Sequence, residues 1–223
     1  MSEPYKNPVK KLIPSKLETG YQKLMYKLLG RFIPKSATPN MVTTVGVLGG
    51  AAAIIFAFLA NISPLFFIGT IAGLFVHMTA DVLDGYVARS RGMSSRAGAY
   101  YDLISDVLIS TFLILAFGLT PYAHIELAAF GAPLYGVMNV TMMNYIIYFN
   151  EFQFPRLGPI EAHIAYSVFC ILSMIVGSRT LFTVFGLNVM AGDILMLIAL
   201  IPMYYEMIRM AIALFRRLKE LEK

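Results

Sequence analysis

Four aspartates in the first half of the chain have a spacing that would let them act together. Asp81 and Asp84 are three residues apart and Asp102 and Asp106 are four apart, so each pair would lie on one face of a helix. Both pairs adjoin apolar stretches, where charged side chains usually mark a function. Carboxylate oxygens favour Mg²⁺ or Mn²⁺, and two ions about 3.5–4 Å apart would stabilise both oxygens of an in-line displacement at phosphorus. The spacing therefore predicts a site for two metal ions.

Small and basic residues accompany the aspartates. Gly85, Ala88 and Gly98 have little or no side chain, which predicts a close approach of the two helices and room for a phosphate beside the backbone. Arg89 follows Asp84 by about one helical turn, and its guanidinium could bind phosphate oxygens in a fork. The alternative for Arg89 is a side chain that reaches from the apolar region to the membrane surface.

The spacing resembles the complete signature of the CDP-alcohol phosphotransferase family. The chain reads Asp81-x-x-Asp84-Gly85-x-x-Ala88-Arg89, then eight residues, then Gly98-x-x-x-Asp102-x-x-x-Asp106. Members pass the phospho-alcohol of a CDP-linked donor to a hydroxyl acceptor and release CMP. The resemblance implies that Asp81, Asp84, Asp102 and Asp106 bind the two metal ions, and that Asp106 also takes the proton from the attacking hydroxyl.

The same resemblance implies contacts with the nucleotide and with the acceptor. Its nucleotide contacts correspond to Asn40, Thr43, Gly85, Arg89 and Ser95, although Asn40 could instead cap a helix that follows Pro39. Choline and ethanolamine phosphotransferases of the family carry a Gly-Pro-Thr-Glu segment, and the stretch 158–161 is similar, with Ile in place of Thr. We therefore expect acceptor contacts near this stretch, from Glu161, His163 and Arg156.

The reaction can run with either kind of lipid substrate in phospholipid biosynthesis. One direction uses CDP-choline or CDP-ethanolamine with a lipid alcohol, and the segment 158–161 favours it. The other uses CDP-diacylglycerol with inositol phosphate, serine or glycerol phosphate. A phosphorylated acceptor would need several basic groups above the metals, and beyond the cluster from Arg89 to Arg96 only Arg156 is obviously placed. A cation transporter would also explain buried carboxylates, but not Arg89 beside them.

The elements that hold these residues are membrane helices. With 58% hydrophobic and 14% charged residues and a mean hydropathy of +0.69, the chain is too apolar for an ordinary soluble domain. A membrane span needs about 20 mostly apolar residues. The basic residues flank such spans, and no soluble part remains to hold a nucleic acid. We predict an all-α, six-helix transmembrane domain over residues 41–223, with spans near 41–60, 63–88, 99–119, 124–149, 159–178 and 189–215.

Residues 1–40 form a polar and basic segment before the first span. Within it, residues 15–33 carry an apolar stripe and several lysines, which predicts an amphipathic helix in the membrane interface. A soluble helix packed on the cytoplasmic face of the bundle is the alternative. Ser15, with Glu18 three residues later, fits a capping box at the start of this helix.

The charge distribution predicts the orientation in the membrane. All lysines and arginines except Arg179 fall in segments that this topology places on one side. Since such residues concentrate on the cytoplasmic side, both termini and the active site are predicted to be cytoplasmic. The family resemblance adds a homodimer. His77, four residues before Asp81, could line the site or bond to a neighbouring helix.

Overall fold

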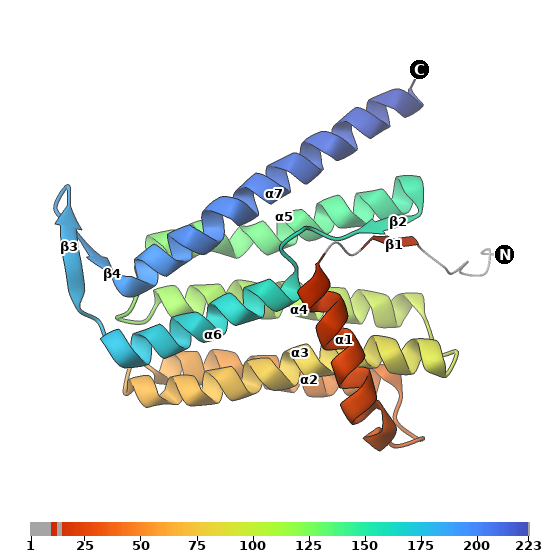
Figure 1. Ribbon diagram of the computed structural model, residues 1–223, viewed down its shortest axis with the longest axis horizontal. Coiled ribbons are helices and arrows are strands. Elements are labelled where there is room, and N and C mark those ends of the chain that lie inside the picture. The colour runs from red at the N-terminus through yellow and green to blue at the C-terminus, as the bar shows by residue number, and fades with distance from the viewer. Residues whose placement is uncertain (1–9, 13–14, 223) are drawn as a thin grey trace.

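The protein is described here by a computed structural model, which covers residues 10–12 and 15–222 (Figure 1). Helices make up 78% of it, which confirms the all-α class. Most of them run alongside one another as a bundle, while the first crosses it steeply. Their bounds are α1 Lys16–Leu29, η1 Gly30–Phe32, α2 Pro39–Leu59, η2 Pro64–Phe66, α3 Phe67–Ser90, α4 Arg96–Gly118, α5 Ile125–Phe149, α6 Pro159–Val176 and α7 Ala191–Leu221.

Five helices of the described chain are long and apolar enough to cross a membrane. They are α2, α3 together with η2, α4, α6 and α7, so the protein is a multi-pass membrane protein. Helix α5 occupies the remaining predicted window and has 25 residues, yet it is not among the five. Asn139 and Asn144 lower its apolarity. The six-span count therefore stays a prediction.

Helices α2 and α3 pack closely against each other. A Cβ atom at Gly73 would stand 2.6 Å from the carbonyl oxygen of Gly49 and 2.8 Å from the amide nitrogen of Ala53. The sequence had placed the close approach of two helices at Gly85 and Gly98, and this is wrong. A Cβ at Gly85 would meet the Arg89 guanidinium, and one at Gly98 would meet the side chains of Asn40 and Ser95.

We expect Gly73→Ala to destabilise the fold by about 1–3 kcal/mol, because the added methyl meets backbone atoms that cannot rotate away. Thermal unfolding in detergent, followed by circular dichroism, measures the change. Gly20→Ala is the matched control, since nothing lies within 4 Å of a Cβ there and Gly20 is in helix α1. Equal melting temperatures for the two variants would refute the contact.

Helix α1 begins as predicted but does not complete its capping box. The Ser15 hydroxyl accepts a hydrogen bond from the Glu18 amide at 3.1 Å, which confirms the N-cap. The Glu18 side chain does not return to Ser15: its Oε1 accepts from Gln22 Nε2 at 2.8 Å, and the residue is only 4% exposed. This half of the capping-box prediction is wrong, because Glu18 turns into the protein.

Helix α1 has one face on the bundle and one face uncovered. Met25 packs with Val82 and Leu83 of α3, and the Tyr21 hydroxyl lies 2.7 Å from Thr79 Oγ1 of the same helix. The uncovered face carries large apolar side chains, as an interfacial helix requires. These exposed residues are Leu17, Leu24 and Leu28, and Phe32 of the following η1 is exposed as well. The position of α1 in the membrane interface stays a prediction that this face supports.

Two short pairs of strands were not predicted. β1 (Lys10–Leu12) pairs in parallel with β2 (Glu151–Gln153), which follows α5. β3 (Thr180–Val184) and β4 (Leu187–Met190) form a hairpin between α6 and α7, which projects from one end of the bundle in Figure 1. Phe185 and Gly186 at its tip have φ of 50° and 81°, the positive values that tight hairpin turns require.

The apolar core lies toward the hairpin end of the bundle. It is built on the rings of Phe67, Phe117, Tyr122 and Phe169, which meet edge to face or at a tilt. The buried polar side chains of α3 and α4 follow it toward the other end. The core therefore gathers the hairpin-side halves of α3 and α4, and the aspartates of both helices lie beyond it, toward their other ends.

Candidate metal and nucleotide site

Three of the four aspartates converge. Asp81 of α3 and Asp102 and Asp106 of α4 each offer a carboxylate oxygen, and these oxygens lie within 4.8 Å of one another. Each side chain is partly buried. An all-oxygen set of this kind fits a hard divalent cation such as Mg²⁺ or Mn²⁺. The residues present therefore suit the metal that the sequence implies.

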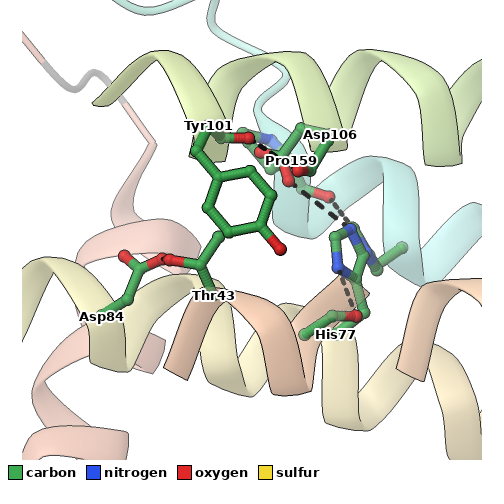
Figure 2. A network of polar contacts seen from close by, with 9 residues as sticks. Thr43, His77, Asp84, Tyr101, Asp106 and Pro159 are labelled. Carbon is green, nitrogen blue, oxygen red and sulfur yellow. Dashed lines mark hydrogen bonds and ion pairs between the residues drawn. The ribbon is translucent and has the colours of Figure 1, made fainter. Parts of the chain in front are cut away.

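Asp84 lies beside this group and is held by α2. It is buried at 6% exposure, and its Oδ2 accepts a hydrogen bond from Thr43 Oγ1 at 2.5 Å. Figure 2 shows the Asp84–Thr43 pair on one side of the site and Asp106 on the other. Asp84 lines the same two cavities as Asp102, so the fourth carboxylate reaches the site without being part of the tight group.

His77 connects the site to α2. Its Nδ1 lies 3.2 Å from the carbonyl oxygen of Gly46, and since a carbonyl only accepts, the proton is assigned to Nδ1. Its Nε2 then faces Asp106 Oδ1 at 3.6 Å (Figure 2). Both alternatives for His77 therefore hold, because it bonds to a neighbouring helix and also lines the site.

The five residues assigned to the nucleotide line one cavity of about 580 Å³. Its walls come from the start of α2, the end of α3 and the start of α4, and its floor includes Asp84 and Asp102. Pockets for small molecules usually measure about 300–1,000 Å³. The structure thus brings together the whole predicted set, namely Asn40, Thr43, Gly85, Arg89 and Ser95.

Local contacts position these residues. Arg89 donates from Nη2 to the Tyr26 hydroxyl at 2.8 Å, and its guanidinium occupies the space that Gly85 leaves. Ser95 caps α4, because its Oγ accepts from the Gly98 amide at 3.0 Å. Asn40 does not cap α2: Thr38 does so, accepting from the Met41 amide at 3.3 Å. The capping alternative for Asn40 is therefore wrong.

A second cavity adjoins the first, since Asp84, Arg89 and Asp102 line both. All four aspartates and Arg89 line it, together with side chains from α1, α5 and the segment that follows α5. The contribution of α1 was not predicted, because Glu18 had been interpreted only as part of a capping box. The α1 residues in its wall are Glu18, Gln22 and Tyr26.

The three residues expected to contact the acceptor are placed differently from one another. Glu161 accepts from the Gly158 amide at 2.9 Å and from the Ser15 hydroxyl at 2.5 Å, so it caps α6 and ties it to α1. Arg156 is exposed, and its backbone amide donates to Glu206. His163 alone approaches the aspartates: it lines a small cavity with His77 and Asp106, and its Nδ1 lies 2.8 Å from the Pro159 carbonyl.

This arrangement of carboxylates, an anchored arginine and a nucleotide-sized cavity agrees with the comparison to known families. A family model described as CDP-alcohol phosphatidyltransferase matches residues 36–215. The chain belongs to the CDP-alcohol phosphatidyltransferase family. A comparison with curated proteins finds no match. Its general activity as a CDP-alcohol phosphatidyltransferase follows from this membership.

The family match covers most of the CDP-alcohol phosphatidyltransferase site, but not all of its walls. Residues 36–215 contain the four aspartates, Arg89 and the whole nucleotide cavity. Helix α1 lies before the match, although its side chains line the second cavity and hold Arg89. The wall formed by α1 is thus a feature of this chain that the family match does not describe.

Proposed function

We propose that the protein is a metal-dependent phosphotransferase that passes the phospho-alcohol of CDP-choline or CDP-ethanolamine to a lipid alcohol and releases CMP. One observation carries the proposal. The predicted nucleotide contacts line one cavity, all four aspartates line a second cavity, and Asp84, Arg89 and Asp102 line both. A donor with its cytidine in the first cavity would place its pyrophosphate at the carboxylates and its alcohol in the second.

The aspartates and Arg89 would have separate roles in the reaction. Asp81, Asp84, Asp102 and Asp106 would hold two Mg²⁺ or Mn²⁺ ions, which when bound polarise the phosphoryl oxygens and acidify the acceptor hydroxyl. Arg89, held by Tyr26, would neutralise charge on the phosphates as the pyrophosphate bond breaks. Asp106 would take the proton of the attacking hydroxyl.

An apolar crevice supports a lipid substrate. It lies between α4, α5, α6 and α7, and its lining is almost entirely hydrophobic. Tyr135, Ala162 and Met203 belong both to this crevice and to the second cavity. An acyl chain in the crevice would therefore bring its head group to the aspartates.

The charges of the second cavity favour an acceptor without phosphate. Among the residues that the structure describes, Arg89 is the one basic residue in its lining, and the exposed Arg156 is not part of it. Inositol phosphate or glycerol phosphate would meet carboxylates there without further cations to balance its charge. The direction with a lipid alcohol as acceptor does not meet this difficulty.

The orientation and the assembly belong to the same proposal. The end of α7 and the loop between α3 and α4 lie at the same end of the bundle in Figure 1. With the positive charge concentrated there, we place the site and both termini on the cytoplasmic side. A homodimer is proposed on the family resemblance alone.

The test is CMP release by the purified protein in detergent. We expect release from CDP-choline or CDP-ethanolamine when diacylglycerol and Mg²⁺ are present, and none after chelation. Turnover of CDP-diacylglycerol with glycerol phosphate, but of neither CDP-amino alcohol, would overturn the proposed direction. Transport of divalent cations across vesicle membranes, without CMP release from any donor, would overturn the proposal that the protein is an enzyme.

A further inference from the structure

Helix α1 contributes a buried carboxylate that is only half satisfied. Glu18 is 4% exposed, its Oε1 accepts from Gln22, and its Oε2 is buried and has no hydrogen-bond partner. The Ile160 amide favours the charged form, but makes no hydrogen bond of ordinary geometry to Oε2. A buried acceptor without a partner costs about 1–3 kcal/mol, so its retention calls for an explanation.

The surroundings of Glu18 point toward a cation. Its carboxylate lines the second cavity, and the charges that act on it there, Asp81 and Glu161, are both negative. Burial raises the pKa of the Glu18 carboxyl above its ordinary value, and the two neighbouring carboxylates raise it further. The cavity thus contains an acidic group that a positively charged ligand would stabilise in its ionised form.

Aromatic rings line the same cavity. They come from α1, α5 and the segment around β2, and two of them, Phe152 and Phe154, meet with ring centroids 4.4 Å apart. A carboxylate combined with aromatic faces is the chemistry that binds quaternary and primary ammonium groups. The rings in the lining are those of Tyr26, Tyr135, Phe152 and Phe154.

We infer that Glu18, with these rings, binds the ammonium group of an amino-alcohol substrate and thereby selects it over neutral and phosphorylated alcohols. The inference rests on the proposed function, since the amino alcohol is the group transferred or the group accepted. It gives α1 a role in specificity, although α1 lies outside the family match.

Two other tasks for Glu18 fit the structure less well. Glu161 already caps α6 by accepting from the Gly158 amide, and the Ile160 amide in the first turn of α6 leaves Glu18 Oε2 without a partner, so capping of α6 does not account for this oxygen. Glu18 is also absent from the described group of carboxylates that could share a metal ion, which consists of Asp81, Asp102 and Asp106.

Glu18→Gln tests the inference, because the amide keeps the shape and the bond to Gln22 but removes the charge. We expect the KM for CDP-choline and CDP-ethanolamine to rise about tenfold or more, the loss of a charge-assisted contact, with kcat within about twofold. CDP-glycerol, which has no ammonium group, should keep its KM. Serine with CDP-diacylglycerol is a further arm, since a rise confined to serine would place the ammonium on the acceptor.

Two variants separate recognition from structure. Ser15→Ala removes the cap of α1 and its bond to Glu161 but leaves the Glu18 carboxylate, so it should lower the melting temperature without changing the preference for amino alcohols. Glu18→Asp is the substitute test if Glu18→Gln fails to fold. It keeps the charge and should therefore retain part of the preference for amino alcohols.

Binding alone provides a second readout. Calorimetry should show that CDP-choline binds the unaltered protein more tightly than CDP-glycerol, and that Glu18→Gln removes the difference. If the protein turns over only substrates without an ammonium group, the proposed reaction class stands and this inference falls. If it turns over no CDP-alcohol, the proposed function falls, and the calorimetric comparison still decides the role of Glu18. The inference would also be overturned if Glu18→Gln weakened the binding of all substrates equally or changed the Mg²⁺ requirement.

Discussion

Each of the variants Asp81→Asn, Asp84→Asn and Asp102→Asn should abolish turnover, with a fall in rate of at least about 10³-fold. A neutral amide holds a hard divalent ion poorly, and the several kcal/mol of charge stabilisation that the ions supply would be lost with it. CMP release measures the loss, and calorimetry with Mg²⁺ or Mn²⁺ measures the weakened binding. The unaltered protein should lose activity with a chelator and recover it when either ion is returned.

Asp193→Asn is the matched control for removal of a buried carboxylate. Asp193 is 3% exposed, and it accepts from the backbone amides of His124 and Met190 near the start of α7, beside the hairpin. Its replacement should lower the melting temperature while metal-dependent turnover persists. Full activity of the three aspartate variants, or of the unaltered protein in metal-free buffer, would contradict the two-metal proposal.

Asp106→Asn should separate binding from chemistry. We expect donor binding to remain largely intact while the transfer rate falls by about 10²–10⁴-fold, the usual effect of losing a positioned proton acceptor. The geometry agrees with a special position for this residue, since Asp106 is one helical turn beyond Asp102 and faces His77 at 3.6 Å. Calorimetry of CDP-donor binding, run beside a CMP-release assay, measures both quantities.

The comparison with Asp84→Asn decides between two roles for Asp106. If Asp106→Asn abolishes donor binding as completely as Asp84→Asn does, Asp106 serves mainly as a metal ligand. The base would then be sought at His163, which lines a small cavity with Asp106, and not at Glu161, whose two oxygens already bond to Gly158 and Ser15.

The helices were predictable because their causes are local. Each long apolar stretch became a helix close to its predicted bounds, except that α7 continues to Leu221, beyond the predicted end at 215. Ser15 and Ser95 are caps in the positions where serine favours a helix start. The first pair of strands was missed for a matching reason. β1 and β2 are three residues long and lie far apart in sequence, so neither has a pattern of its own.

The metal and nucleotide residues were predictable because the family signature is continuous in sequence. The residues of the segment 81–106 lie on two consecutive helices joined by a short loop, so their spacing already implies a common site. The spacing did not imply which of the aspartates lie closest together. Only the structure distinguishes Asp84, held by Thr43 of α2, from the tight group formed by the other three.

The sequence by itself determined the membrane class, the family signature and the helix bounds, since these depend on apolar length, residue spacing and local caps. Tertiary structure alone decided what Glu18 and Glu161 do. Each is an acid in the first turn of its helix, and sequence assigned the first to a cap and the second to the acceptor. Docking of α1 onto α3 and α6 reverses this, because Ser15 bonds to Glu161 and the Glu18 carboxylate is carried into the second cavity. Such a choice depends on contacts between segments more than 140 residues apart, which no local pattern contains.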